Sequence, residues 1–202
     1  MRDQIQATLK KRSRLDLSQK ISDCACVALI VLNSPQRKPH IGFIVRAQNP
    51  LDKWSGQIAF PGGRRDSSEE DFLDAALRET WEEIGLRLSS QHSLGQLSDI
   101  RARKGGQMLD FFIRPFVFLI EEDFSPLLDP AEVASFHWVE LEHLIKPENQ
   151  TRIQMTKDDI SIDLPATHII DQAPPLWGLT YLMIQDFLSA LRSADLLSVD
   201  NK

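Results

Sequence analysis

One short stretch, CACVALIVL at residues 24–32, constrains the fold of this 202-residue chain more than any other feature. It is a nearly continuous apolar run with several β-branched residues, and the turn-forming sequence NSPQRKP follows it. Such a run is typical of a strand that is buried on both faces. Residues 40–48, HIGFIVRAQ, predict a second strand, so residues 24–48 are expected to form a hairpin. The core strand therefore needs covering layers on both sides.

The remaining hydrophobic pattern alternates between strand and helix signals. Helical spacing of apolar residues predicts helices at 2–13, 71–84 and 174–194, and Gly85 is expected to cap the middle one. Pro115 implies that its strand lies at a sheet edge or is broken. The order β-β-β-α-β-β-β-α predicts an α/β (α+β) fold with a central mixed sheet and helices packed against it. Further strands are expected at 56–60, 93–98, 108–120 and 135–140, a short helix at 141–145, and a small hairpin from RIQM and ISIDL.

The length fits one well-buried domain with extensions and is too short for two ordinary domains. We expect an N-terminal helical extension at 1–20, one domain at 21–194 and a frayed tail at 195–202. The first or the last helix could mediate a homodimer, and the sequence does not decide this.

Charge and apolar content exclude several function classes. The net charge is −6, from 23 Lys and Arg against 29 Asp and Glu, so nucleic acid and anionic membranes are not expected partners. No apolar run approaches the roughly 20 residues of a spanning helix, and the N-terminus lacks the apolar core of a secretory signal. A cytoplasmic protein is expected. Cys24 and Cys26, two apart in a strand, are interpreted as small core residues.

Residues 56–86, GQIAFPGGRRDSSEEDFLDAALRETWEEIGL, hold the chemistry, and we call them the box segment. On a helical wheel, three glutamates lie at positions i, i+3 and i+4 and share one face within a single turn. The wheel places an apolar stripe on the roughly opposite side. The glutamates are Glu79, Glu82 and Glu83, and the stripe residues are Leu73, Leu77, Trp81 and Ile84.

Three like charges at this spacing repel one another, and near a helix C-terminus they also oppose the helix dipole. Arg78 is the only basic residue interleaved with them. A solvated acidic face is the plain alternative. Clustered carboxylates without Cys or His suit a hard divalent ion such as Mg²⁺ or Mn²⁺. Gly62 and Gly63, just before the helix, allow backbone to approach a ligand closely, so the combination indicates a site for phosphate and metal.

These residues resemble the signature box of Nudix hydrolases, which are a family of diphosphate-cleaving enzymes. The match comprises the glycine pair, Glu70, and RETWEEIGL at 78–86. It departs at Thr80, where an aliphatic residue is usual, and six residues rather than five separate Gly63 from Glu70. The extra residue, GQIAFPGG at 56–63 and LWGLTYLMI at 176–184 resemble the branch of coenzyme A pyrophosphatases. The resemblance covers roughly residues 24–192 and implies a Nudix-type α/β/α sandwich.

The resemblance also implies roles for single residues. Members hydrolyse a nucleoside diphosphate linked to another group, by attack of a metal-activated water on phosphorus. Arg78 would orient a box glutamate, and Glu70 takes the place of the first box glutamate, with compensation of the helix dipole as an equal alternative. The implied ligands of Mg²⁺ (or Mn²⁺) are Glu79, Glu82, Glu83 and the Gly62 carbonyl. Glu82 also counts among the catalytic residues, and the implied substrate contacts are Arg46, Gln57, Gly63 and Arg64.

The general base and the substrate stay open at this point. Glu121, Glu122 and Glu132 are candidate bases, and Glu132 is taken forward. RARKGG at 101–106 is interpreted as a basic loop, either solvated or meeting phosphates. A small-molecule diphosphate is the expected partner, with coenzyme A or an acyl derivative ranked first. Sugar nucleotides, dinucleoside polyphosphates and nucleoside triphosphates follow, and a non-catalytic nucleotide-binding module is the alternative class.

Overall fold

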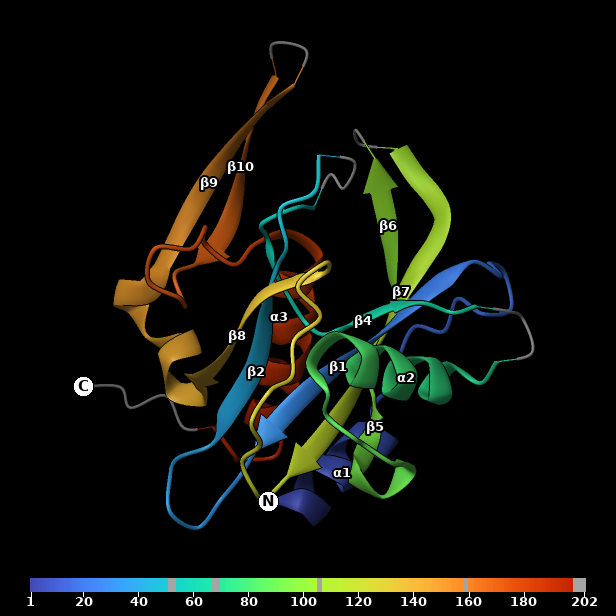
Figure 1. The fold of residues 1–202 in the computed structure, drawn as a ribbon, viewed down its shortest axis with the longest axis vertical. Helices are drawn as coiled ribbons and strands as arrows, with labels where there is room; N and C mark the ends of the chain where they lie inside the picture. The colour runs from blue at the N-terminus through green and yellow to red at the C-terminus, as the bar shows by residue number, and fades with distance from the viewer. Residues whose placement is uncertain (51–53, 67–69, 105–106, 158–159, 198–202) are drawn as a thin grey trace.

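A computed structural model describes residues 1–50, 54–66, 70–104, 107–157 and 160–197. Its core is an eight-stranded mixed sheet, and a separate two-stranded arm projects from it (Figure 1). The helices are α1 (Arg2–Lys11), α2 (Phe72–Ile84) and α3 (Gly178–Ser193), with short 3₁₀ turns η1 (Ser90–His92), η2 (Leu141–Ile145) and η3 (Pro147–Asn149). The strands are β1 (Cys24–Leu32), β2 (His40–Arg46), β3 (Ile58–Ala59), β4 (Gly62–Arg64), β5 (Ser93–Gln96), β6 (Ile100–Lys104), β7 (Gln107–Ile120), β8 (Val133–Glu140), β9 (Gln150–Lys157) and β10 (Ile160–Thr167).

The predicted fold class is confirmed. β1 is a central strand, buried on both faces, and it runs parallel to β7 over its whole length. The other strand pairs are antiparallel, so the sheet is mixed. α2 lies on one face of the sheet, and α3 with α1 lies on the other (Figure 1). The two faces of β1 therefore contribute to two separate hydrophobic clusters, as an α/β/α arrangement requires.

The predicted hairpin of β1 and β2 forms only near its turn, where Val31 pairs with Ile41. Beyond that point the two strands separate, and β3 and β4 fill the gap: β3 pairs with β2, and β4 pairs with β1. The segment that the sequence predicted as one strand and a loop is thus two short strands. This insertion places Gly62 and Gly63 beside the middle of the sheet.

Two details of β6 and β7 differ from the predictions. Residues 101–106 were expected in a basic loop, but residues 101–104 belong to β6, which pairs with β7; residues 105–106 lie outside the described chain. Pro115 neither breaks β7 nor lies at an edge, because β1 flanks it on one side. On the other side, β5 ends opposite Phe116 and β6 begins opposite Ile113, with the Leu97 N–H donating to the Pro115 carbonyl at 2.9 Å. The missing N–H of proline therefore falls where the neighbouring strand changes.

Other local predictions agree with the structure. The β9–β10 hairpin and the short helical turn at Leu141–Ile145 are confirmed. Cys24 and Cys26 are both free and buried. α1 buries Ile5 and Leu9 against the sheet and α3. None of the helices in the described residues is long and apolar enough to cross a membrane.

Candidate active site

The box segment is organised by its two helix caps. Asp71 caps the start of α2 by accepting a hydrogen bond from the Leu73 N–H at 2.8 Å, and Gly85 ends it with a left-handed φ of 71°. The expected apolar stripe is wrong at one position: Trp81 is 41% exposed and lies under the Arg87 guanidinium, 4.1 Å from the ring centroid. The fully buried positions of α2 are Ala75, Ala76, Thr80, Glu83 and Ile84, and Leu73 and Leu77 pack partly buried beside them.

Glu83 is the unexpected member of that buried face, because it is only 2% exposed. Its Oε2 accepts a hydrogen bond from the Gly62 N–H at 2.7 Å, while its Oε1 is buried without a hydrogen-bond partner among the described residues. Burial raises the pKa of Glu83 to about 8, and the nearby Arg46 charge only partly opposes this. An unpaired carboxylate oxygen in such a place is costly, and a cation or a proton would stabilise it.

The two glycines let the main chain approach these carboxylates. Gly62 has a φ of 142°, and a side chain there would collide with the β1 backbone at Cys26 and Val27. A methyl group on Gly63 would overlap the Glu79 carboxylate. Burial also raises the pKa of Glu79 above its ordinary value, with Arg78 opposing the shift. Glycine at both positions therefore makes room for the acidic cluster.

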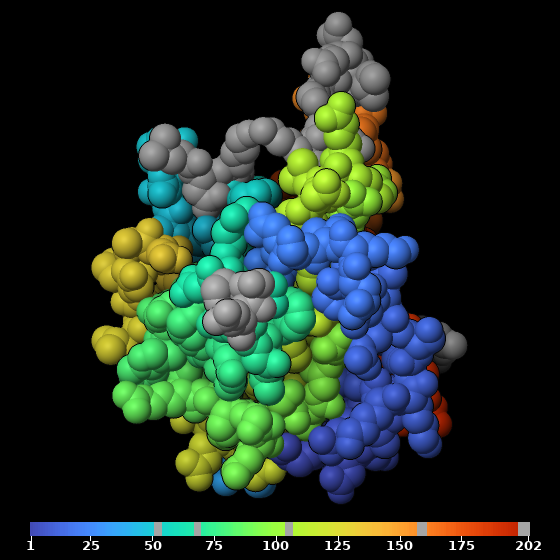
Figure 2. All heavy atoms as spheres, turned by 90° about the vertical axis from the view of Figure 1, so that its right-hand side faces the viewer, coloured from blue at the N-terminus to red at the C-terminus, as the bar shows by residue number. Residues whose placement is uncertain are grey.

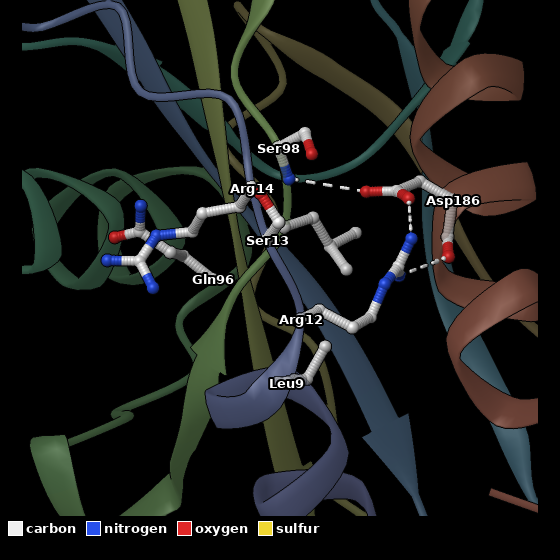
Figure 3. Close-up of a pocket in the computed structure, with 8 residues that line it drawn as sticks. Leu9, Arg12, Ser13, Arg14, Gln96, Ser98 and Asp186 are labelled. Atoms are coloured by element: carbon white, nitrogen blue, oxygen red, sulfur yellow. Dashed lines mark hydrogen bonds and ion pairs between the residues drawn. The ribbon is translucent and has the colours of Figure 1, made fainter. Parts of the chain in front are cut away.

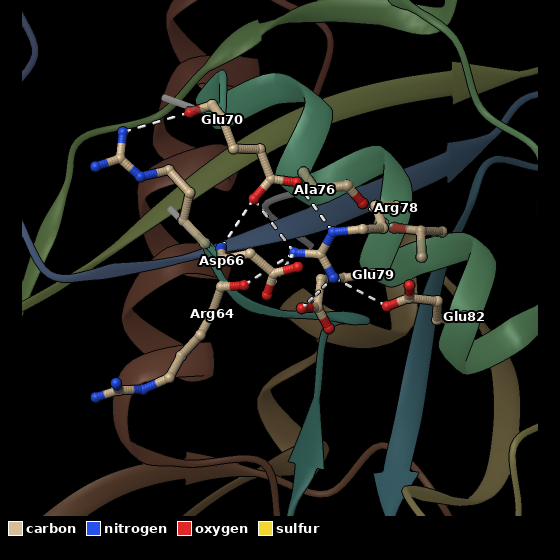
Figure 4. Close-up of polar contacts among 9 residues, drawn as sticks. Arg64, Asp66, Glu70, Ala76, Arg78, Glu79 and Glu82 are labelled. Carbon is tan, nitrogen blue, oxygen red and sulfur yellow. Dashed lines mark hydrogen bonds and ion pairs between the residues drawn. The ribbon is translucent and has the colours of Figure 1, made fainter. Parts of the chain in front are cut away.

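Arg78 joins the acidic residues of the box segment (Figure 4). Its Nε donates to Glu70 Oε1 at 2.9 Å, and its Nη1 donates to Glu79 Oε1 at 2.8 Å and Glu82 Oε2 at 2.9 Å. The hydrogen bonds to Glu70 are the main reason that the pKa of Arg78 is raised. Arg78 also meets the Arg64 carbonyl at 3.0 Å and the Asp66 carboxylate at 3.6 Å.

Glu132 enters the site from a distant part of the chain, just before β8. The preceding loop docks on the end of α2, because the Asp129 N–H donates to the Glu83 carbonyl at 3.0 Å. The Glu132 carbonyl accepts from the Ala47 N–H at 2.8 Å, next to the end of β2. The Glu132 charge contributes to the raised pKa of both Glu79 and Glu83. The structure thus brings Glu132 to the cluster, whereas Glu121 and Glu122 are exposed at the end of β7.

The predicted substrate contacts gather around the same glycines. Arg46 ends β2, and its N–H donates to the Gln57 carbonyl at 3.0 Å. The Arg46 charge opposes part of the rise in the pKa of Glu83. Arg64 is exposed, bonds Asp23 at 3.2 Å, and lies 4.9 Å from the centroid of the Phe111 ring.

A family model described as the NUDIX domain matches residues 25–159. The chain belongs to the Nudix family.

Named relatives and one solved structure agree with this assignment. The chain is 36% identical over 120 residues to "Uncharacterized protein C14C4.10c" of Schizosaccharomyces pombe, covering 58% of this chain and 36% of that protein. It is 28% identical over 112 residues to "Uncharacterized Nudix hydrolase NudL" of Yersinia enterocolitica, covering 48% and 55%. The chain thus spans between about a third and somewhat over half of these relatives. A MutT/nudix family protein from Enterococcus faecalis shares the fold, with a TM-score of 0.60 and 14% identity over 96% of this chain and 75% of that one.

The Nudix box of this chain fits a divalent cation by its donor atoms. In the described residues, no group of three acidic, His or Cys side chains is arranged to hold a metal ion. Glu79 and Glu82 are paired with Arg78 instead. Arg78 takes only one oxygen of each, however, and the second oxygen of Glu83 is unpartnered. Carboxylate oxygens of this kind are the donors that Mg²⁺ and Mn²⁺ prefer.

A cavity of about 380 Å³ borders the end of β2, on the face of the sheet where Val45, Ile170 and Ala173 pack against the α1 and α3 cluster. Val45 and Gly56 line it, and they are the chain neighbours of the predicted contacts Arg46 and Gln57. The sequence analysis did not single out its other lining residues. The polar positions alternating with aromatic ones in SFHWVE were the available signal for Ser135 and His137. The remaining lining residues are Gln48, Ser55, Ile170, Asp171, Gln172, Ala173 and Pro174.

A second, small cavity lies between α1, β5 and α3 (Figure 3). It is a packing contact between these elements and not a ligand site. Its volume is about 10 Å³, room for about one water molecule. Arg12 crosses it to pair with the Asp186 carboxylate at 2.6 Å, and the Ser98 N–H donates to the same carboxylate at 3.2 Å. These contacts fasten α1 to α3.

Proposed function

We propose that this protein hydrolyses the diphosphate linkage of a nucleoside diphosphate derivative in the presence of Mg²⁺ or Mn²⁺. The observation that carries this proposal is the unpartnered Oε1 of Glu83, buried beside Glu79 and the two glycines of the Nudix box. A purely structural acidic helix gives no reason to bury a carboxylate with one oxygen unsatisfied.

Glu79, Glu82 and Glu83 would hold the cation, with the Gly62 carbonyl as a further ligand. When bound there, the cation neutralises diphosphate charge and lowers the pKa of a coordinated water. Arg78 keeps Glu79 and Glu82 in place through one oxygen each, which leaves the other oxygens free to face a ligand. Glu70 in turn holds the Arg78 guanidinium through both its oxygens.

Glu132 is proposed to accept the proton of the attacking water. It is exposed at the mouth of the cluster, and its charge reaches both buried glutamates. A general base must lie within hydrogen-bond reach of the proton it removes, and the docked loop before β8 brings Glu132 to this side of α2.

The substrate is proposed to lie with its phosphates over Gly63, between the guanidinium groups of Arg46 and Arg64. Two cations offset the acidic character of the chain at this point, which a polyanionic ligand requires. The remainder of the substrate would enter the cavity beside β2. Lys and Arg are absent from the described lining of that cavity, and its hydroxyl, amide and imidazole groups with the Asp171 carboxylate suit a polar group without negative charge.

Coenzyme A or an acyl derivative ranks first as substrate, supported by the resemblance of GQIAFPGG and the longer box loop. Sugar nucleotides, dinucleoside polyphosphates and nucleoside triphosphates rank behind it. A non-catalytic nucleotide-binding module is the competing class. The presence of all three box glutamates and Arg78 favours the enzyme over that class.

The test is phosphate release after phosphatase treatment, from a panel of these diphosphates with Mg²⁺ or Mn²⁺. Wild type would be compared with Glu83→Gln and with Glu148→Gln, a matched change at an exposed position away from the site. We expect turnover of one substrate class that is lost in Glu83→Gln and kept in Glu148→Gln. Nucleotide binding without turnover of any substrate would instead support the binding module.

A further inference from the structure

Residues 15–23, which we call the strap, precede the part of the chain that the family model matches. The strap runs along the flank of the Nudix box, where the N-terminal residues lie against the box residues in Figure 2. Its main chain is bonded on both sides: the Asp99 N–H donates to the Leu15 carbonyl at 2.9 Å, and the Phe112 N–H donates to the Asp23 carbonyl at 3.2 Å. The strap is therefore fixed to the sheet beside the site.

The strap completes the pairing of a buried cation, Arg114. The Arg114 side chain is only 5% exposed, and it donates to the fully buried Asp99 at 2.8 Å and 2.7 Å. Its third carboxylate contact is to Asp16 of the strap at 2.7 Å. Asp99 is tied to the strap as well, because it accepts from the Leu17 N–H at 2.7 Å. A buried charge of this kind is held in a narrow range of positions by its partners.

Two guanidinium groups meet at Phe72, the first residue of α2. The Arg114 guanidinium carbon is 4.2 Å from the centroid of the Phe72 ring, and that of Arg65 is 4.4 Å away. Arg65 is also bonded to the strap, through the Ser22 carbonyl at 3.2 Å. Cations on an aromatic face attract it electrostatically, so both arginines hold the ring. The strap thus acts on the start of α2 through two separate side chains.

The same helix carries the acidic cluster, and Arg65 connects the strap to that cluster. Its Nη1 donates to the Glu70 carbonyl at 3.5 Å, and the Glu70 side chain holds Arg78. Since α2 is one continuous helix, fixing Phe72 fixes the rotation of Glu79 and Glu83 toward the glycines. We propose that Phe72 and Arg114 are positioning residues, through which the strap sets the geometry of the carboxylates that would bind the cation.

This proposal rests on the proposed function, because it concerns the same carboxylates. Its alternative is that Phe72 only fills the core. The two differ in what Phe72→Leu does: core filling predicts a loss of stability alone, and positioning predicts a loss of metal affinity beyond that of an equally destabilising change. Phe116→Leu is the matched control, because Phe116 is packed in the same hydrophobic cluster but has only Phe118 as its ring contact in the described chain.

The experiment is titration of the full chain with Mn²⁺, following free Mn²⁺ by electron paramagnetic resonance, together with thermal unfolding. We expect Phe72→Leu to weaken Mn²⁺ binding by about tenfold, in the range seen when residues behind metal ligands are changed. Phe72→Tyr, which keeps the ring, should restore the affinity to within about twofold. Phe116→Leu should lower the melting temperature with little change in affinity.

Equal Mn²⁺ affinity in Phe72→Leu and Phe116→Leu would overturn the proposal. If Phe72→Leu does not fold, Asp16→Asn decides the question, because it removes only the charge that the half-exposed strap residue offers to Arg114. We expect Asp16→Asn to bind Mn²⁺ more weakly than wild type. If Asp16→Asn folds and its Mn²⁺ affinity is unchanged, the proposal is likewise overturned. A wild-type protein that binds no Mn²⁺ would instead reject the proposed function and this proposal with it.

Discussion

The Gly62 amide donates to one oxygen of Glu83 at 2.7 Å, and the other oxygen of that carboxylate is buried without a partner in the described residues. This hydrogen bond links the short strand β4 to the last turn of α2. Burial and the negative charges of Glu132 and Glu79 disfavour the ionised form of Glu83, and the Gly62 hydrogen bond and the Arg46 charge oppose them only in part. The consequences can be measured without any substrate.

The first prediction concerns the pH dependence of stability without metal. The pKa of Glu83 is about 8 in the folded protein against an ordinary 4.5, so the folded state binds more protons between these values. Stability must therefore fall as pH rises through this window. We expect the melting temperature in EDTA to fall from pH about 4.5 to about 8. Glu83→Gln, which cannot ionise, should show a smaller fall, and Glu148→Gln should follow wild type. Equal slopes in all three proteins would contradict the prediction.

The two glycines are expected to differ sharply when changed to alanine. In Gly63→Ala the atoms nearest the added methyl belong to the far end of the Glu79 side chain, which can shift, and the backbone is compatible with alanine. Stability should stay equal or rise by about 0.4–1 kcal/mol, while Mn²⁺ affinity falls because Glu79 is displaced. In Gly62→Ala the methyl meets the β1 backbone at a φ of 142°.

For Gly62→Ala we expect a loss of at least about 2 kcal/mol in the free energy of unfolding. Urea unfolding and Mn²⁺ titration of both variants check the pair. A Gly63→Ala protein that binds Mn²⁺ like wild type would show that Glu79 is not a ligand.

The role of Arg78 is expected to depend on the planar shape of its guanidinium group and not on its positive charge alone. It donates to three carboxylates through Nε, Nη1 and Nη2, and a lysine ammonium cannot reproduce that planar arrangement. We expect Arg78→Lys to lower hydrolysis by about 10- to 100-fold, as for changes behind metal ligands. Steady-state rates at saturating Mg²⁺ test this. Arg87→Lys, at an exposed residue just after α2 whose guanidinium lies over Trp81, is the control and should keep full activity.

The helix of the box segment could be predicted from sequence because its limits are local. Asp71 caps its start and Gly85 ends it, and the residue types aspartate and glycine themselves indicate these two helix ends. The burial of Glu83 could not be predicted this way. A helical wheel treats three glutamates as one exposed face, whereas the real face depends on β4 pairing with β1, which brings a glycine amide to Glu83.

The same reasoning explains the other departures. Residues 101–104 look like part of a basic loop because charged side chains dominate them, yet they belong to β6, which is paired with β7. Pro115 is tolerated inside the sheet because two different strands meet beside it, which only the complete topology reveals. Glu132 is put forward over Glu121 and Glu122, but its approach to α2 could not be predicted, because it depends on a loop that docks through main-chain bonds.

The final prediction separates these three candidate bases. The Glu132 charge acts on Glu79 and Glu83, whereas Glu121 and Glu122 are exposed next to one another beyond β7. We expect Glu132→Gln to lower kcat by about 10²- to 10⁴-fold, the usual contribution of a general base. Its Mn²⁺ affinity should change much less, because the box carboxylates remain. Glu121→Gln and Glu122→Gln should keep the wild-type rate. A Glu132→Gln protein with full activity would move the proton acceptor elsewhere, and a loss of Mn²⁺ binding equal to the loss of rate would make Glu132 a ligand rather than a base.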